Sequence, residues 1–283
     1  MQCAPLSGER GAGGESKNWH FLYLLVLLIL NACEAPVDWQ FHPEENGALV
    51  VESIITNEMK TQEVLLSLSY SDLNGEAQPA TGAEVKVLGA GQTWFFQEDP
   101  DQPGRYLSES AFAGLLHVKY QLQIGWNSNT YAAENFMVQV IPYTNLTFNP
   151  VAGTDSLTFG NVPPTFSPHE QAMYEIHIDW SHLTGSDSAR AKVFFYTFNT
   201  LDVNQLLRPP KERILFPRGS IIIGKKYSLN PDFANYFRAL AAETEWQGGI
   251  LDEASASLPT NVSNGGLGFF GVSAVLSDTL VAE

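Results

Sequence analysis

Residues 63–70 read EVLLSLSY, and the alternation in this stretch decides the fold class. Its even-numbered positions are all apolar or aromatic, whereas its odd-numbered positions carry Glu63, Leu65 and two serines. A period of two is typical of a β-strand with one buried face. Residues 72–75 (DLNG) follow with turn-forming side chains, so we expect the strand to end there.

Short strands joined by turns continue on the C-terminal side of this stretch. Residues 83–88 (AEVKVL) and 93–97 (TWFFQ) flank Gly89-Ala90-Gly91, which predicts a hairpin whose turn needs positive φ. Residues 118–126 and 131–140 predict two more strands around Asn127-Ser128-Asn129. Because no amphipathic helix interrupts them, these strands favour an antiparallel β-sandwich over residues 47–143.

The second half of the chain is less regular but also rich in strands. In residues 174–180 (YEIHIDW), Tyr174, Ile176, Ile178 and Trp180 share one side, which we expect to face inward. Asn230-Pro231-Asp232 has the residues of a helix start, and residues 265–275 predict a glycine-marked final strand. We therefore expect a mainly β protein with two β-sandwich-like domains, residues 47–143 and 144–283, the second with one inserted helix near 231–245.

The N-terminal segment has the parts of an export signal. Arg10 and Lys17 precede ten consecutive apolar residues, 21–30 (FLYLLVLLIL), which are too few to span a bilayer. Leu30-Asn31-Ala32-Cys33 then resembles a bacterial lipobox, in which the cysteine receives a diacylglyceryl group. We expect residues 1–32 to be a lipoprotein signal peptide, Cys33 to carry the lipid, and residues 33–46 to be a polar tether.

Charge and cysteine content exclude several classes of protein. The chain has a formal net charge of −16, so we expect it to repel nucleic acid and anionic headgroups. Cys3 lies in the predicted signal, which leaves Cys33 without a partner for an intramolecular disulfide. The chain has neither a P-loop nor a dinucleotide-binding fingerprint, so we expect no cofactor.

Glu175, His177 and Asp179 form the strongest candidate for chemistry, because alternation places them on one strand face. Imidazole and carboxylate groups spaced in this way can share a metal ion, commonly with at least three ligands in tetrahedral sites. The alternative interpretation is a solvated polar face, and we favour it. No Gly-x-Ser-x-Gly elbow is present, so we expect no catalytic residue and no enzymatic activity.

Two further motifs are candidates for binding or modification. Trp94, Phe95 and Phe96 place aromatic rings on both faces of one strand, so either both faces are covered or one presents a ring to a glycan, peptide or protein. Three tripeptides of the form Asp-Ser/Thr-apolar resemble a bacterial O-glycosylation sequon. Their acceptor residues are Ser156, Ser188 and Thr279.

With these elements placed, the mature chain resembles the Bacteroidetes lipoprotein family catalogued as domain of unknown function 4249. The likeness lies in the order of its segments. These are residues 50–58 (VVESIITNE), 81–87 (TGAEVKV), 103–106 (PGRY), 112–114 (FAG), 120–124 (YQLQI) and 259–271 (PTNVSNGGLGFFG). The first half also resembles carboxypeptidase-regulatory-like and transthyretin-like sandwiches.

The family resemblance implies a location and a partner but no catalytic residue. Members are often encoded beside TonB-dependent outer-membrane receptors. We therefore expect an outer-membrane lipoprotein, facing the periplasm or the cell surface, that is a non-enzymatic accessory to such a receptor or its ligand. The alternatives are a carboxylate- or metal-dependent envelope hydrolase and a structural or adhesive surface module.

Lipidation of Cys33 can be tested directly. We expect mass spectrometry of the mature N-terminus to show a diacylglyceryl cysteine, and Cys33→Ala to move the protein from the membrane fraction to the soluble fraction. A soluble wild-type protein that keeps residues 1–32 would contradict the prediction.

Overall fold

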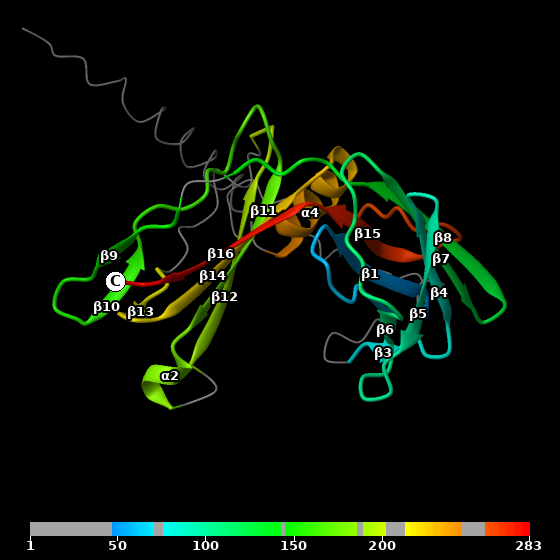
Figure 1. Cartoon of the computed structure of the whole chain (residues 1–283), viewed down its shortest axis with the longest axis horizontal. Helices are drawn as coiled ribbons and strands as arrows, with labels where there is room; N and C mark the ends of the chain where they lie inside the picture. Colours follow the sequence, from blue (N-terminus) through cyan, green and yellow to red (C-terminus); the bar gives the residue numbers. More distant parts are fainter. Residues whose placement is uncertain (1–46, 71–75, 143–144, 186–188, 202–212, 245–257) are drawn as a thin grey trace, which may run out of the picture. The chain divides into compact units, whose positions relative to one another are not determined.

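The computed structural model describes residues 47–70, 76–142, 145–185, 189–201, 213–244 and 258–283, all of which belong to one compact unit (Figure 1). The predicted signal peptide, Cys33 and the tether lie outside these residues. The described part is mainly β, as the alternation predicts, with a long helix at residues 231–244.

A nine-stranded sheet contains most of the first half of the chain. Its strands are β1 (Leu49–Thr56), β2 (Glu63–Leu68), β3 (Gln78–Pro79), β4 (Glu84–Gly89), β5 (Gln92–Glu98), β6 (Arg105–Ser108), β7 (Lys119–Trp126), β8 (Asn129–Phe136) and β15 (Leu267–Ser273). The main path runs β15-β1-β2-β6-β5-β4-β7-β8, and β3 pairs with β2. Every pair in it is antiparallel except β1 with β15, which is parallel.

The two predicted hairpins are confirmed. Between β4 and β5, Ala90 and Gly91 have φ of 49° and 73°. Between β7 and β8, Asn127 and Ser128 have φ of 47° and 64°. Two-residue loops with positive φ at both positions match the right-handed twist of the flanking strands, which explains the glycine and asparagine at these turns.

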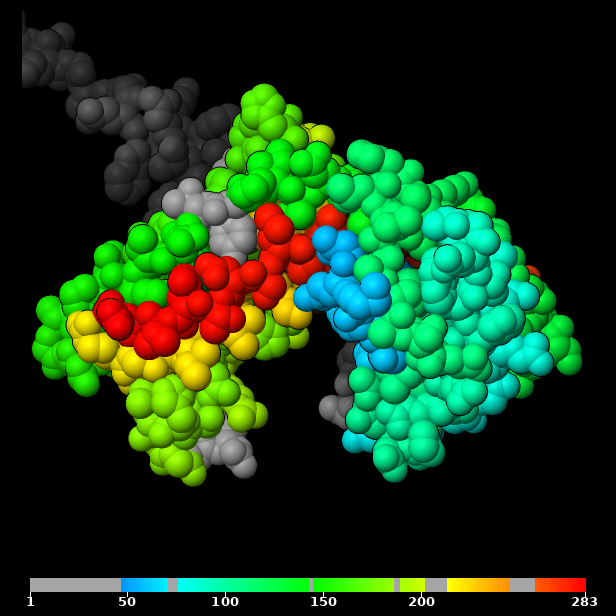
Figure 2. Space-filling view, viewed as in Figure 1, coloured from blue at the N-terminus to red at the C-terminus, as the bar shows by residue number. Residues whose placement is uncertain are grey.

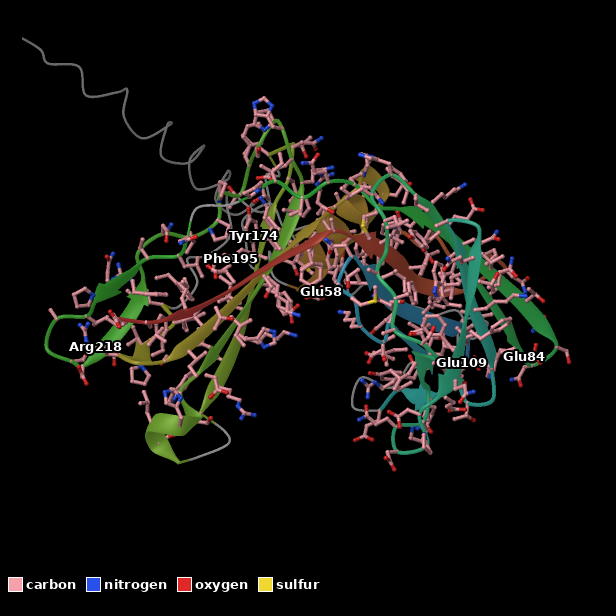
Figure 3. All side chains as sticks on the ribbon, in the orientation of Figure 1. Glu58, Glu84, Glu109, Tyr174, Phe195 and Arg218 are labelled. Carbon is pink, nitrogen blue, oxygen red and sulfur yellow. The ribbon has the colours of Figure 1, made fainter. Side chains whose placement is uncertain are left out.

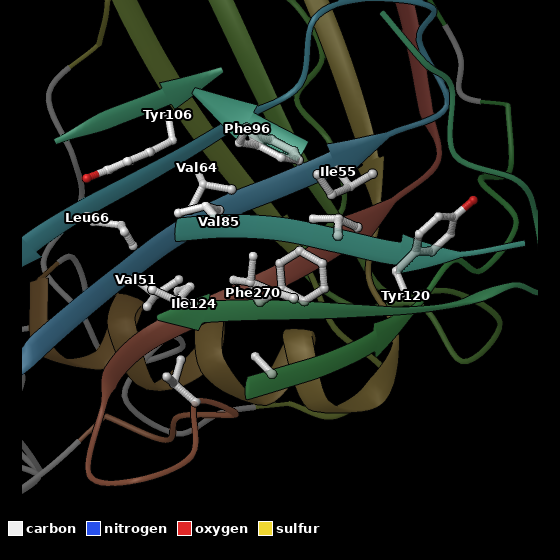
Figure 4. Packing of buried hydrophobic residues seen from close by; sticks show 14 of the residues in the cluster. Val51, Ile55, Val64, Leu66, Val85, Phe96, Tyr106, Tyr120, Ile124 and Phe270 are labelled. Atoms are coloured by element: carbon white, nitrogen blue, oxygen red, sulfur yellow. The ribbon is translucent and has the colours of Figure 1, made fainter. Parts of the chain in front are cut away.

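The inner face of the nine-stranded sheet encloses a continuous apolar core (Figure 4). Alternate residues of β1, β2, β4 and β7 point into it, including Val51, Val64, Val85 and Ile124. Tyr106 is also buried there, and its hydroxyl donates to the Ala80 carbonyl (2.8 Å). A buried tyrosine needs such a partner, because an unpaired hydroxyl costs roughly 1–3 kcal/mol in an apolar core.

Two smaller sheets pack against each other in the second half. The four-stranded sheet has the order β12-β11-β14-β16 and the three-stranded sheet the order β13-β10-β9. The strands are β9 (Phe148–Pro150), β10 (Ser156–Phe159), β11 (Ala172–Asp179), β12 (Arg190–Thr197), β13 (Phe216–Pro217), β14 (Ile221–Ser228) and β16 (Val275–Val281). Leu157 and Phe216 of the smaller sheet share a core with Ile176, Ile178 and Ile222 of the larger.

The inward side predicted for residues 174–180 is confirmed, although burial is only partial at its end. Tyr174, Ile176 and Ile178 are buried. Trp180 follows the last residue of β11, precedes the single-turn helix α2 (Ser181–Thr184), and is only partly buried. Its side chain still packs against the core that contains Ile176 and Ile178.

The predicted helix is confirmed as α4 (Pro231–Thr244). Asn230 caps it, since its side-chain oxygen accepts the Phe233 N–H (3.0 Å). The helix packs on the outer face of β15, where the rings of Phe233 and Phe269 stack at a centroid distance of 5.0 Å (Figure 1). This packing buries one stripe of the helix, comprising Phe233, Ala234, Phe237 and Ala241.

The closing segment differs from the single strand expected over residues 265–275. It forms two strands: β15 joins the nine-stranded sheet and β16 the four-stranded sheet. The chain crosses between sheets at Ala274, whose N–H donates to the Ser228 hydroxyl (2.9 Å). The second half therefore contributes a strand to the first sheet, because β15 falls in the predicted domain of residues 144–283. Local alternation predicts a strand but not the sheet that it joins.

Asparagine side chains tie the two ends of the nine-stranded sheet together. Asn261 accepts the Phe270 N–H (2.9 Å) and donates to the Phe270 carbonyl (2.9 Å) and to the Glu134 carbonyl of β8 (3.1 Å). Asn135 of β8 also donates to the Phe270 carbonyl (3.0 Å). We call Asn135 and Asn261 the amide clasp. It satisfies backbone groups that β15 and β8 would otherwise leave unpaired at the sheet edges.

Gly271 offers a test of the packing between α4 and β15. A Cβ atom at this position would lie 2.3 Å from the Phe233 ring. We expect Gly271→Ala to lower the free energy of unfolding by about 1–3 kcal/mol, because overpacking a well-packed core forces side chains to shift. Urea unfolding would measure the loss.

Gly125→Ala is the matched control, because a Cβ there would meet only Glu84, at 3.8 Å, an ordinary contact. Shortening the opposing ring with Phe233→Leu in the Gly271→Ala background should recover part of the loss. A Gly271→Ala protein as stable as the wild type would refute the packing argument.

Candidate functional site

The candidate residues from the sequence are Glu175, His177 and Asp179. They lie on β11, on the face opposite the core that contains Ile176 and Ile178. β12 and β14 pair with β11 on either side, and place Lys192, Phe194 and Lys225 on strand positions opposite His177 and Glu175. The structure thus supplies basic and aromatic neighbours that spacing along one strand does not predict.

Glu175 is not the solvated residue that the sequence suggests. Its side chain is only 13% exposed, and both of its oxygens have partners. Oε1 contacts His177 Nε2 (2.7 Å) and the Lys192 ammonium, and Oε2 accepts the Tyr227 hydroxyl (2.9 Å). The interpretation as open polar surface is therefore wrong for Glu175, because neighbouring strands cover it.

The partners of Glu175 control its ionisation. Burial by itself raises the pKa of the Glu175 carboxyl, but hydrogen bonds from Lys192, His177 and Tyr227 outweigh it and hold the pKa below its usual range. Burial, followed by the Glu175 charge, raises the pKa of the Tyr227 hydroxyl. At neutral pH Glu175 is thus an ionised acceptor, and each of its oxygens already has a partner within the protein.

Asp179 belongs to a separate set of contacts. It accepts hydrogen bonds from the Ser181 hydroxyl (2.6 Å) and the Ser181 N–H (2.9 Å), and it pairs with Arg190 (2.9 Å). The Ser181 hydrogen bonds, followed by the Arg190 charge, lower the pKa of Asp179. Within the described residues, no group of three or more His, Cys, Asp or Glu side chains is arranged to hold a metal ion.

A second set of charges continues from Tyr227 to the first sheet. Glu58, which follows β1 and is labelled in Figure 3, pairs with Lys60 (2.9 Å) and lies 3.6 Å from Lys225 of β14. Lys60 lines a pocket of about 460 Å³ together with Glu63 and Tyr227. We call Glu58, Lys60, Glu175, His177, Lys192, Lys225 and Tyr227 the seam network. Each of its two carboxylates pairs with at least one lysine, and the Glu58–Lys225 contact links the two sheets, which is typical of a structural network.

The aromatic strand 94–96 has one ring on the open side. Trp94 stacks on Phe112 at a centroid distance of 4.2 Å, and Phe96 is buried in the core. Phe95 points to the opposite face and is 55% exposed. Of the two alternatives that the sequence leaves open, the structure selects an outer face that presents a ring.

Phe95 borders a hollow of about 580 Å³ on the outer face of β4, β5, β7 and β8. We call this hollow the outer groove, and Gly125 lies between its lining side chains. Its polar and outward aromatic lining consists of Glu84, Lys86, Phe95, Gln97, Glu98, Glu109, Gln123 and Thr130, of which Figure 3 labels Glu84 and Glu109. Spacing along the chain could not predict this set, because only the pairing of four strands brings it together. The alternation around Phe95 was its single signal in the sequence.

The three predicted glycosylation acceptors lie in different settings. Ser156 is half-buried in β10, and Thr279 is exposed on β16, an outer strand visible at the surface in Figure 2. Ser188 lies outside the described residues. Modification of all three stays a prediction.

Comparison with known families agrees with the resemblance that the order of the sequence segments indicated. The model of the family described as Domain of unknown function (DUF4249) matches residues 34–279. The chain belongs to the DUF4249 family. No curated protein is similar enough to this DUF4249 chain to count as a match. Among its described helices, none has the length and apolar character needed to cross a membrane.

The pH dependence of stability tests the role of Glu175 in this DUF4249 chain. Because its folded-state pKa lies below the usual 4.5, its contribution is complete above that value and is lost as pH falls through the lower folded value. We expect Glu175→Gln to cost about 1–3 kcal/mol at pH 7, and this difference from the wild type to shrink below pH 4.5. Urea unfolding between pH 7 and pH 3 would measure it.

Glu134→Gln is the matched control, because Glu134 also pairs with a lysine of a neighbouring strand, Lys119, but is exposed. An exposed pair contributes about 0–1 kcal/mol. If Glu175→Gln were as stable as the wild type at pH 7, or differed from it equally at all pH values, the seam network would not have the role assigned to it.

Proposed function

We propose that this protein is a lipid-anchored, non-enzymatic binding protein of the outer membrane that works with a TonB-dependent receptor. Cys33 is its anchor, and its ligand-binding surface is on the described β-rich part. The lipobox-like segment supports the location, and the gene neighbourhood that the family resemblance implies is the reason for naming this partner.

The outer groove is the observation that carries the binding role. It is open, has an exposed ring at its border, and combines apolar and polar groups, as ligand sites do. The Glu84 and Lys86 side chains have no hydrogen bond or ion pair with other described residues, so both remain available to a ligand.

The seam network supports a non-enzymatic role over a hydrolase. A general base at neutral pH needs a pKa near the working pH and a free lone pair aimed at the substrate. Glu175 has the opposite properties, since its pKa is lowered and both of its oxygens already accept hydrogen bonds. Asp179 is likewise held by Ser181 and Arg190.

The acidic character of the chain favours a protein or a ligand, and not the lipid surface, as the binding partner of the folded part. With a net charge of −16, the protein is repelled by anionic headgroups. Attachment then depends on the lipid at Cys33, while the folded part stays free to meet a receptor facing the periplasm or the cell surface.

Cross-linked outer membranes would test the proposed partner. A tagged, lipidated protein is recovered after cross-linking, and the co-purified proteins are identified by mass spectrometry. We expect a TonB-dependent receptor to be enriched over a Cys33→Ala control, because loss of the anchor removes the protein from the membrane.

Two outcomes would contradict the proposal. Recovery of adhesin or secretion components in place of a receptor would favour a structural or adhesive module. Stoichiometric zinc binding in calorimetry that is lost in His177→Ala would favour the metal-dependent hydrolase.

A further inference from the structure

One strand position in the outer groove, near the end of β7, has no side chain. Gly125 of β7 pairs with Glu84 of β4 and Thr130 of β8 and faces the outside with them. A Cβ built on Gly125 would meet only the Glu84 side chain, at 3.8 Å and 3.9 Å, so the space above it is open. The outer face of the sheet is therefore open at Gly125, where any other residue would place a side chain.

Phe95 forms the apolar border of this hollow. It lies on β5 directly opposite Lys86 of β4, and 55% of it is exposed although its neighbours Trp94 and Phe96 pack inward. A single exposed aromatic ring is common on protein surfaces and by itself needs no explanation. Its position beside a hollow with unpaired polar groups is what suggests a ligand.

The polar border can both donate and accept hydrogen bonds. Gln97 donates to Glu109 (2.9 Å), and Gln123 donates to Gln121 (2.9 Å). These contacts orient the amides and leave the carbonyl oxygen of Gln123 without a donor among the described residues. Together with the free carboxylate of Glu84 and the free ammonium of Lys86, the groove offers several acceptors and one strong donor.

The pairing of the strands excludes one common kind of partner. A peptide often binds by adding a strand to a free sheet edge. β4, β5 and β7 each pair with a neighbour on both sides, so their backbone groups are already used at the groove. Recognition here must depend on side chains.

Charge complementarity restricts the chemical class of the ligand further. The groove is lined by the carboxylates Glu84, Glu98 and Glu109 and by one ammonium, Lys86. This excess of negative charge opposes an anionic ligand, whereas hydroxyl groups donate well to carboxylates. A pyranose sugar combines an apolar C–H face, which stacks on an aromatic ring, with hydroxyls around its edge.

From this geometry we propose that the outer groove binds a neutral carbohydrate, with Phe95 stacking on one sugar ring and Glu84, Lys86 and Gln123 bonding its hydroxyls. This inference rests on the proposed binding function and names the class of ligand. The 580 Å³ of the hollow suits a few sugar units of a longer chain.

A binding experiment on the mature lipidated protein in detergent micelles would test this inference. The probes are neutral hexasaccharides of glucose, mannose, galactose, xylose and N-acetylglucosamine, with hexagalacturonate as the anionic comparison. We expect at least one neutral probe to bind in calorimetry and hexagalacturonate to bind more weakly. Phe95→Ala should lower the affinity about tenfold, the scale of one aromatic contact, and Phe95→Tyr should retain it.

Matched variants separate a binding defect from a folding defect. Phe166→Ala removes another exposed ring, which lies away from the groove, and should bind as the wild type does. Gly125→Leu fills the hollow without changing Phe95 and should also weaken binding. Urea unfolding of each variant checks that it folds.

Several outcomes would overturn the inference. They are the failure of every neutral probe to bind, equal binding by Phe95→Ala and the wild type, and tighter binding of hexagalacturonate through Lys86. Receptor capture from cross-linked membranes is independent of these measurements. A captured receptor without sugar binding would refute only the ligand class, and sugar binding without a receptor would refute only the partner.

Discussion

The parallel pairing of β15 with β1 brings the end of the described chain beside its beginning. Gly268 makes this approach possible: its φ is +80°, and a Cβ there would lie 2.1 Å from the Val51 carbonyl oxygen. Once β15 is in place, Phe270 points into the first core and Phe269 into the contact with α4. The amide clasp then holds β15 to β8 at the other end of the sheet path. A single strand thus connects the first core, the helix and, through Ala274, the second pair of sheets.

Polar groups have two different uses in this protein. In the seam network, at the amide clasp and around the crossing at Ala274, nearly every polar group shown has a partner within the protein, which is what burial requires. Lys226 follows the same rule, because its buried ammonium donates to the Ile141 carbonyl (2.8 Å) and to Glu170 (2.6 Å). The rule does not apply in the outer groove, where Glu84 is exposed and Lys86 is half-buried, and both keep their bonding capacity for something outside the chain. This contrast is the physical basis for assigning structure to one cluster and binding to the other.

Local features of the structure follow from short-range rules and could be predicted. The hairpin turns at Ala90-Gly91 and Asn127-Ser128 need positive φ, and the helix start at Asn230 needs a side-chain acceptor. Alternation also identified the buried side of β11 as far as Ile178. It was wrong for Glu175, because burial of an outward side chain depends on strands and segments far away in the chain. No periodicity in residues 174–180 encodes the arrival of Lys192 and Tyr227.

The sequence by itself determined the mainly β class, the hairpins, the capped helix and the family, because each depends on neighbouring residues or on the order of motifs along the chain. It also contains the lipobox-like segment on which the expected anchor depends. Only the tertiary structure decided that β15 crosses to the first sheet, that Glu175 is enclosed by its partners, and that Phe95 borders an open hollow. These features arise from pairings between distant strands. The residues of a strand determine which of its faces is apolar. The free energy of the whole packed arrangement determines which neighbouring element covers that face.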